Sequence, residues 1–196
     1  ISCGTGTAYG ALRRLNLAGD DTIAIFGQGP VGLSATMLAK AMGARVITVD
    51  VSPERLGLSE SFGADVTLNP REHDPIAAIK DLTHREGADV ALDCSASPEA
   101  RIAAVRSTRA WGTVCFVGEG NDVTIDVSPD MIRKQLTILA SWTFNTVGQA
   151  ECARFITDRQ IPVDRIFTHR FSLDQAEDAY KLFDTQTTGK GVFIFP

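Results

Sequence analysis

The chain contains 196 residues, of which 44% are hydrophobic, and its 19 basic and 24 acidic residues give a formal net charge of −5. These values are typical of a globular protein with one large domain, or with one domain and an appendage. The sequence contains no basic run with interleaved aromatic residues, which argues against nucleic acid as a partner. No apolar run approaches the roughly 18 residues needed to span a bilayer, so no membrane segment is expected. Because the chain begins at Ile1 rather than Met, we expect it to be a piece of a longer protein.

The four cysteines are scattered, and no two of them have the C-x-x-C spacing of a metal or redox motif. Three lie in strand-like or helix-like segments, where a free thiol is usually a small core residue. The fourth lies in an opening segment that Gly4 and Gly6 are expected to make flexible. We therefore expect no disulfides and a reducing, cytoplasmic location. In chain order the cysteines are Cys3, Cys94, Cys115 and Cys152.

The first elements are a helix, a strand and a glycine-rich turn. Ala8, Leu12 and Leu15 recur at helical spacing, and a turn at residues 17–21 follows them. An apolar run at residues 23–26 is typical of a strand buried on both faces. It leads into a G-x-G-x-x-G motif, Gly27-Gln28-Gly29-Pro30-Val31-Gly32. A second helix with an apolar face then ends at Gly43, and a second strand, residues 46–49, ends at Asp50.

Each part of this motif has a physical role in binding a dinucleotide. Gly27 allows the tight turn from strand to helix, Gly29 lets the backbone approach a diphosphate, and Gly32 lets helix and strand pack closely. The amides and positive dipole of the helix start at Pro30–Val31 face the phosphates. Asp50 can accept hydrogen bonds from both hydroxyls of an adenosine ribose and repels a 2′-phosphate, which favours NAD over NADP. Because strand, helix and acid have the expected order and spacing, the motif predicts a dinucleotide site rather than an unrelated glycine-rich turn.

Further strand and helix units continue to residue 140. Three helices begin with a serine cap, a proline and an acid, a typical start signature: Ser52-Pro53-Glu54, Ser97-Pro98-Glu99 and Ser128-Pro129-Asp130. A fourth helix carries Ile76, Ile79 and Leu82. The remaining strands are predicted at residues 66–68, 88–93, 113–118 and 135–140. The pattern predicts an α/β fold, a Rossmann doubly wound six-stranded parallel sheet with helices on both faces and a switch point between strands one and four.

From Ser141 onward the pattern changes. A helix is predicted at residues 147–158, a break at 161–163 and an extended piece at 165–171. A capping box at Ser172–Gln175 begins another helix, and a last apolar strand at residues 192–195 should pair with another strand.

Several residues outside the glycine motif have less specific predictions. His73 and His84 are expected at the surface, and His169 is expected to be structural. Trp111 is expected to pack in the core, as is the Trp142–Phe144 segment, whose alternative role is a wall of the substrate pocket. Strand six is an apolar edge, so we expect it to pair with a second subunit in a homodimer or homotetramer.

Taken together, several motifs resemble the carboxyl-terminal portion of zinc-dependent medium-chain alcohol dehydrogenases, nearest to their polyol and threonine dehydrogenase branch. The glycine motif alone is shared by many families, whereas the CG-x-x-T-x-YG opening at that distance before it is more specific. The motifs are Cys3-Gly4 with Thr7, Tyr9 and Gly10; residues 27–32; Val49-Asp50; Phe62-Gly63-Ala64-Asp65; Val117-Gly118; and Gly189-Lys190-Gly191-Val192.

The resemblance implies a role for individual residues. Cys3 would be the last protein ligand of a catalytic zinc, and Thr7 would lie beside the nicotinamide. The adenosine ribose would be held by Asp50, Val51 and Arg55, although Arg55 could instead be a solvated helix residue. The nicotinamide end would be lined by Ser95, Val117, Gly118 and Glu119. The implied division is a leading segment (1–19), a Rossmann domain (20–141) and a carboxyl-terminal remnant of the catalytic domain (142–196).

The implied activity is NAD-dependent oxidation of a small alcohol, with zinc polarising the substrate oxygen in the full-length enzyme. A catalytic zinc has three protein ligands, so we expect the chain alone to bind no catalytic zinc and to turn nothing over. Two alternatives stay open: a zinc-free quinone or enoyl reductase of the same superfamily, and a non-catalytic NAD(H)-binding module. A methyltransferase fits less well, because the Pro30–Gly32 helix start suits a diphosphate better than a methionine tail.

Overall fold

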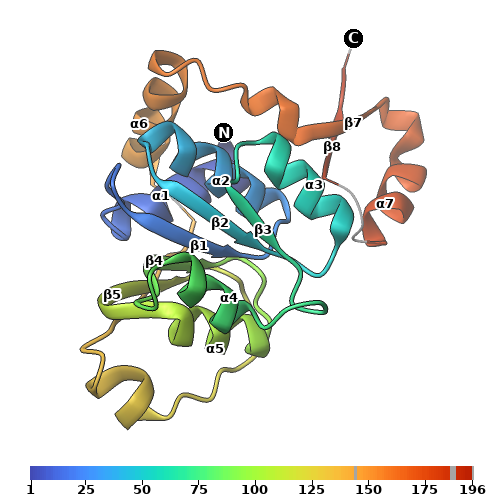
Figure 1. The fold of residues 1–196 in the computed structure, drawn as a ribbon. Helices are drawn as coiled ribbons and strands as arrows, with labels where there is room; N and C mark the ends of the chain where they lie inside the picture. The colour runs from blue at the N-terminus through green and yellow to red at the C-terminus, as the bar shows by residue number, and fades with distance from the viewer. Residues whose placement is uncertain (144, 186–188, 196) are drawn as a thin grey trace.

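The computed structural model describes residues 1–143, 145–185 and 189–195, and its centre is one parallel sheet (Figure 1). The strand order is β3-β2-β1-β4-β5-β6, which confirms the predicted six-stranded doubly wound sheet. The strand order reverses between β1 and β4, as predicted, and Phe26 of β1 pairs with Val49 on one side and with Asp93 on the other. The strands are β1 (Thr22–Phe26), β2 (Arg45–Val49), β3 (Val66–Leu68), β4 (Ala88–Asp93), β5 (Thr108–Phe116) and β6 (Thr137–Ala140).

Helices cover both faces of the sheet (Figure 1). One face carries α1 (Thr7–Arg14), α2 (Pro30–Met42), α3 (Pro53–Ser61) and α6 (Thr146–Asp158), and the other carries α4 (Pro75–Leu82) and α5 (Pro98–Ser107). Strand β1 shows why two layers form. Ile23 and Ile25 pack into the hydrophobic cluster under α1 and α2, whereas Ala24 and Phe26 pack into the cluster under α4 and α5. Successive side chains of a strand point to opposite faces, so both faces of β1 are buried.

Two of the three predicted serine caps, Ser52 and Ser97, are confirmed, whereas Ser128 does not cap a helix: η2 (Val127–Ile132) begins before it, after Asp126, with no side-chain cap. The side chains of Ser52, Asp74 and Ser97 accept hydrogen bonds from backbone amides in the first turns of α3, α4 and α5. In each helix a proline occupies the first helical position, where its missing N–H would have no partner in the helix.

The opening segment is not the flexible loop that its glycines suggested. Residues Ser2–Gly6 form a helical turn, η1, in which Gly4, Thr5 and Gly6 are buried. The Gly6 amide donates to the carbonyl of Ile1 at 2.7 Å, and the Thr5 hydroxyl lies 3.2 Å from that of Ser34 in α2. The segment is therefore held in place by burial and hydrogen bonds despite its glycines.

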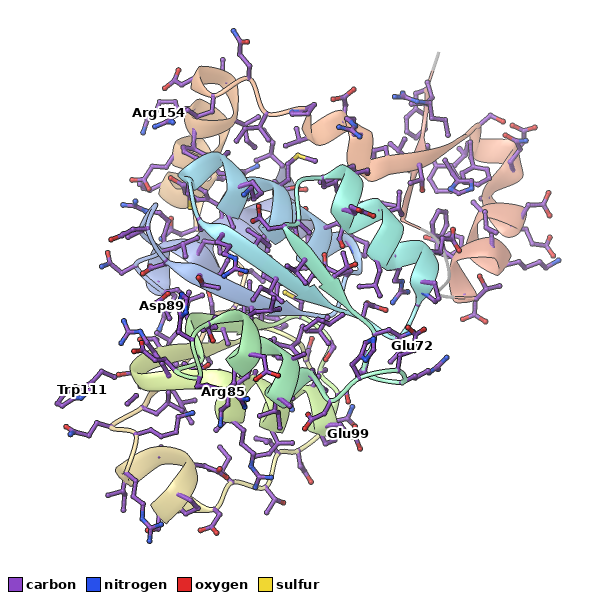
Figure 2. All side chains as sticks on the ribbon, viewed as in Figure 1. Glu72, Arg85, Asp89, Glu99, Trp111 and Arg154 are labelled. Carbon is purple, nitrogen blue, oxygen red and sulfur yellow. The ribbon has the colours of Figure 1, made fainter. Side chains whose placement is uncertain are left out.

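Two tryptophan predictions were wrong. Strand β5 begins at Thr108, five residues before the predicted start, and Trp111 is 67% exposed with a φ of +63°. Figure 2 shows the labelled Trp111 side chain pointing away from the sheet. A Cβ on the neighbouring Gly112 would lie 2.7 Å from the carbonyl oxygen of Asp89, so the irregular strand leaves no room for an inward side chain there. Trp142 is 68% exposed, so it does not pack in the core, and Phe144 lies outside the described residues.

The carboxyl-terminal part forms a small separate sheet. Strands β7 (Phe167–Phe171) and β8 (Lys190–Phe193) pair in parallel, so the last strand does find a partner, and it begins at Lys190 rather than Val192. The predicted capping box at Ser172 and Gln175 is present. The remaining elements are η2 (Val127–Ile132), η3 (Val163–Ile166), η4 (Leu173–Gln175) and α7 (Ala176–Asp184).

The histidines have the predicted surroundings. His73 and His84 are exposed, and the ring of His169 packs against those of Phe171 and Phe183. No helix in the described ranges is both long and apolar enough to cross a membrane.

Candidate functional site

The glycine-rich turn is locked in place by close contacts that exclude side chains. Gly27 has a φ of +87°, and a Cβ there would lie 2.8 Å from the Ser95 side chain. A Cβ on Gly32 would lie 1.8 Å from the carbonyl oxygen of Gly27. Helix α2 therefore starts directly against the end of β1, and the turn lies against the loop that follows β4.

The head of α2 can accept an anion. Gly29 is its N-cap and provides no side-chain hydrogen bond, and Pro30 has no N–H to offer. The amides of Val31 and Gly32 belong to the first turn of this 13-residue helix, where backbone amides have no acceptor within the helix. A Cβ on Gly29 would meet nothing within 4 Å, so this side of the turn is open. An open turn, amides without an acceptor in the helix and the helix dipole fit a diphosphate.

Asp50 follows β2 and is connected to the glycine turn. Its carboxylate is 6% exposed and accepts hydrogen bonds from the Gln28 amide at 2.6 Å and from the Ser52 amide at 2.9 Å. The Arg55 guanidinium lies 3.9 Å away, whereas the Val51 side chain is exposed. A carboxylate has about four acceptor positions, so Asp50 retains capacity for ribose hydroxyls while it fixes the turn.

Gln28 has a structural role that the sequence analysis did not assign. The side chain is fully buried, donates to the carbonyl of Ile25 at 3.4 Å and accepts from the Thr36 hydroxyl at 2.9 Å. It therefore ties the middle of the glycine motif to β1 and to α2. Its polar side chain beside Gly27 in an otherwise apolar stretch was the available sequence signal.

Thr7 and Cys3 lie near the amino terminus and differ in their surroundings. Thr7 is 6% exposed, and its hydroxyl is buried without a hydrogen-bond partner in the described part of the chain. Buried hydroxyls in native proteins are usually satisfied, so this orphaned group is a candidate ligand contact. The Cys3 side chain is exposed. No group of three His, Cys, Asp or Glu side chains among the described residues could hold a metal, so these residues do not form a complete catalytic zinc site.

Two loops close the carboxyl edge of the sheet beyond β4 and β5. The amides of Val117 and Gly118 both donate to the carbonyl of Asp93, at 2.9 and 3.1 Å. A Cβ on Gly118 would lie 2.3 Å from the amide nitrogen of Ala96, so the two loops touch. Ser95 and Glu119 are exposed on these loops.

The buried pair Asp93–Arg101 holds these loops together and was not anticipated from the sequence. Next to it, burial and the Asp93 carboxylate raise the pKa of the Cys94 thiol well above its usual value, so the thiol is uncharged at neutral pH.

Lys190 brings a positive charge from β8 towards the head of α2. A Cβ on Gly4 would lie 3.4 Å from the Lys190 ammonium and 3.9 Å from the carbonyl oxygen of Pro30. A cavity of about 290 Å³ between the carboxyl-terminal part and the glycine turn is lined by Pro30, Lys190, Tyr180 and Phe193, among other residues. The structure therefore brings a cation close to the predicted diphosphate position.

Two curated relatives illustrate the similarity to known proteins. YphC, an uncharacterized zinc-type alcohol dehydrogenase-like protein of Escherichia coli, is 42% identical over 100% of this chain and 56% of its own length. An L-idonate 5-dehydrogenase of Vitis vinifera is 32% identical over 91% of this chain and 50% of its own length. The chain thus spans about half the length of the curated relatives it matches.

Solved structures agree on the fold. An alcohol dehydrogenase of Thermotoga maritima superposes with a TM-score of 0.89 at 30% identity, covering 97% of this chain and 55% of that one. A zinc-binding dehydrogenase of Sinorhizobium meliloti, solved with NADP bound, superposes with a TM-score of 0.81 at 28% identity, covering 90% of this chain and 53% of that one. The resemblance to zinc-dependent alcohol dehydrogenases is confirmed. Because residues 30–158 match its zinc-binding dehydrogenase model, the chain belongs to the zinc-binding dehydrogenase family.

Proposed function

We propose that this chain binds NAD(H) across the carboxyl edge of its sheet. The observation that carries the proposal is the contact between Asp50 and the glycine turn, because the Asp50 carboxylate accepts the Gln28 amide at 2.6 Å. This hydrogen bond fixes the Asp50 carboxylate, the proposed acceptor for the ribose, next to the open start of α2. The open side at Gly29 and the nearby Lys190 ammonium support a diphosphate between them.

We propose NAD rather than NADP as the preferred cofactor. A 2′-phosphate would bring negative charge to the Asp50 carboxylate, which is 6% exposed and is poorly screened by water. Arg55 lies 3.9 Å from that carboxylate and offsets part of the repulsion. The NADP-bound relative from Sinorhizobium meliloti is a reason to test this preference directly.

Parallel titrations of the chain with NADH and NADPH, followed by fluorescence and calorimetry, test both parts of the proposal. We expect saturable NADH binding and at least about tenfold weaker NADPH binding, since one lost or repulsive charged contact of about 1.4 kcal/mol has that effect. Absence of NADH binding by folded chain would refute the dinucleotide site. Equal or tighter NADPH binding would refute the NAD preference alone.

For the longer protein we propose hydride transfer between a small alcohol and NAD. Bound NAD would supply the hydride-accepting ring, while Thr7 and the loops after β4 and β5 would hold its nicotinamide end. The Thermotoga maritima alcohol dehydrogenase and the Vitis vinifera L-idonate 5-dehydrogenase support an alcohol or polyol as the substrate. Cys3 provides one sulfur donor, which does not complete a zinc site, so we expect no alcohol oxidation by the chain alone. Measurable turnover by the purified 196-residue chain would refute that expectation.

Two further properties are proposed from the exposed edge of the sheet and from the free thiols. Strand β6 lies at the end of the strand order, and Trp142 just beyond it is 68% exposed. An open strand edge is a template for pairing, so we propose that two copies associate there; a monomer in sedimentation at micromolar concentration would refute this. The four free cysteines support a reducing, cytoplasmic location.

A further inference from the structure

A buried ion pair lies at the carboxyl end of β4. Asp93 is fully buried and Arg101, in α5, is 7% exposed, with 3.3 Å between the Asp93 Oδ2 and the Arg101 Nε. The other side of the guanidinium donates to two backbone carbonyls, those of Gly118 at 2.6 Å and Asn121 at 2.7 Å. Asp93 is the last residue of β4, and both carbonyls lie in the loop after β5, so one arginine connects the end of β4 to that loop.

The aspartate completes the connection on the β4 side. Its Oδ1 accepts from the amide and hydroxyl of Ser95 at 2.9 and 2.7 Å, and its Oδ2 accepts from the Ala96 amide at 3.3 Å. The Asn121 side chain donates back to the carbonyl of Ala96 at 3.1 Å. The two loops therefore form a closed hydrogen-bonded ring around the ion pair.

The loop after β5 makes a turn through the left-handed region. Gly120 has a φ of +89° and Asn121 a φ of +56°, so two successive residues occupy the left-handed region. Glycine adopts that region freely, and asparagine adopts it more often than most other residues. The carbonyls that Arg101 binds belong to Gly118 and Asn121, on either side of Gly120, so the guanidinium fixes the loop across this turn.

We propose that Arg101, held by Asp93, is a positioning residue for the nicotinamide half of the cofactor. It sets the backbone of residues 117–119 and of Ser95, which face the nicotinamide end in the proposed function, on which this inference rests. Buried ion pairs often add little net stability compared with apolar residues. The pair is therefore better explained by the loop geometry that it fixes, and its loss should affect the nicotinamide half more than the adenosine half.

Comparing NADH with ADP-ribose tests this assignment, because ADP-ribose has the adenosine and diphosphate but no nicotinamide. The variants are Arg101→Met and the matched control Arg106→Met, which changes an exposed arginine in the same helix that pairs with Asp130 at 3.1 Å. We expect Arg101→Met to weaken NADH binding about tenfold or more, as loss of a charged hydrogen-bond network does. ADP-ribose binding should weaken less than about threefold, and Arg106→Met should bind both ligands as the parent chain does.

Removing one member of a buried ion pair can unfold a protein, so a milder variant is included. Asn121→Gly suits the positive φ, leaves the ion pair intact and removes only the bond to Ala96. It should shift the NADH to ADP-ribose affinity ratio in the same direction by a smaller factor, and Arg101→Lys should restore part of the ratio.

An equal loss of both ligands, or an unchanged ratio in folded Arg101→Met and Asn121→Gly, would overturn the positioning role. If the parent chain binds neither ligand, the proposed NAD site itself fails, which is a different result.

Discussion

The orphaned hydroxyl of Thr7 gives a prediction in which stability and binding change in opposite directions. The group is 6% exposed and has no hydrogen-bond partner in the described part of the chain. An unsatisfied buried hydroxyl costs about 1–3 kcal/mol. Thr7→Val keeps the shape and removes the hydroxyl, so we expect the free energy of unfolding to rise by about 1 kcal/mol. For a chain of this size that raises Tm by about 2–4 °C.

The matched control is Thr5→Val, two residues earlier. The Thr5 hydroxyl is also buried, but it lies 3.2 Å from the Ser34 hydroxyl, so its removal breaks a hydrogen bond. We expect Tm to fall by about 2–4 °C, since the net value of such a bond is about 1 kcal/mol. Thermal unfolding followed by circular dichroism measures both variants.

Binding provides the second half of this test. If the Thr7 hydroxyl contacts the nicotinamide end, Thr7→Val should weaken NADH binding about fivefold while ADP-ribose binding stays unchanged. A fall in Tm for Thr7→Val would refute the reasoning, because it would mean that the hydroxyl has a partner in the folded chain. A raised Tm with unchanged NADH affinity would place Thr7 away from the cofactor.

Three further predictions concern the turn, the thiols and pH. The methyl group of Gly29→Ala would meet no protein atom within 4 Å, so this variant should change Tm little but weaken NADH binding at least about tenfold. The methyl group of Gly32→Ala would lie 1.8 Å from the Gly27 carbonyl oxygen, so this variant should lower Tm. In a thiol titration at pH 8, Cys3 should react first because its side chain is exposed. Burial raises the pKa of the Cys115 thiol to about 12, so Cys115 should stay unreactive until the chain unfolds. Burial and repulsion from a neighbouring lysine lower the pKa of Lys134 to about 8, below its unfolded value of about 10.4. Between these values the unfolded chain binds more protons, so in urea unfolding the parent should gain stability relative to Lys134→Met as pH rises from about 8 to 10; no gain would contradict the lowered pKa.

The fold was predictable because its main determinants are local in sequence. Apolar runs such as residues 23–26, serine and proline helix starts such as Ser52–Pro53, and the glycine motif each act within a few residues. Their order along the chain allows few topologies, since parallel strands joined through helices cross over with a right hand.

The missed features depend on contacts between distant segments. Trp111 has a left-handed φ of +63°, and its amide donates to the carbonyl of Lys134, a residue far along the chain, at 2.7 Å. The ion pair Asp93–Arg101 can be given a role only once Arg101 is seen to bind the carbonyls of Gly118 and Asn121, about twenty residues further along the chain. Backbone carbonyls have no sequence signature, so an arginine that binds them cannot be recognised from composition or spacing.

Asp50 shows how one side chain can serve both the fold and recognition, and how the two can be separated. Asp50→Asn keeps one oxygen acceptor but points an NH₂ group at either the Gln28 or the Ser52 amide, so one bond is lost. We expect the variant to lose about 1–3 kcal/mol of stability and to bind NADPH more nearly as well as NADH. Asp65→Asn is the matched control, because the Asp65 carboxylate also accepts a backbone amide, that of Val46 at 2.7 Å, but lies at the opposite end of β2 from Asp50.

Both variants should therefore lose stability in urea unfolding, and only Asp50→Asn should change the ratio of NADPH to NADH affinity. The ratio is measured on the same folded protein with two ligands that differ by one phosphate, so a loss of stability common to both titrations cancels. If Asp50→Asn destabilises the chain and leaves the ratio of NADPH to NADH affinity unchanged, the carboxylate supports the glycine turn but does not discriminate at the 2′ position of the ribose. The assignment of cofactor preference to Asp50 would then be wrong, even if NADH binding itself survives.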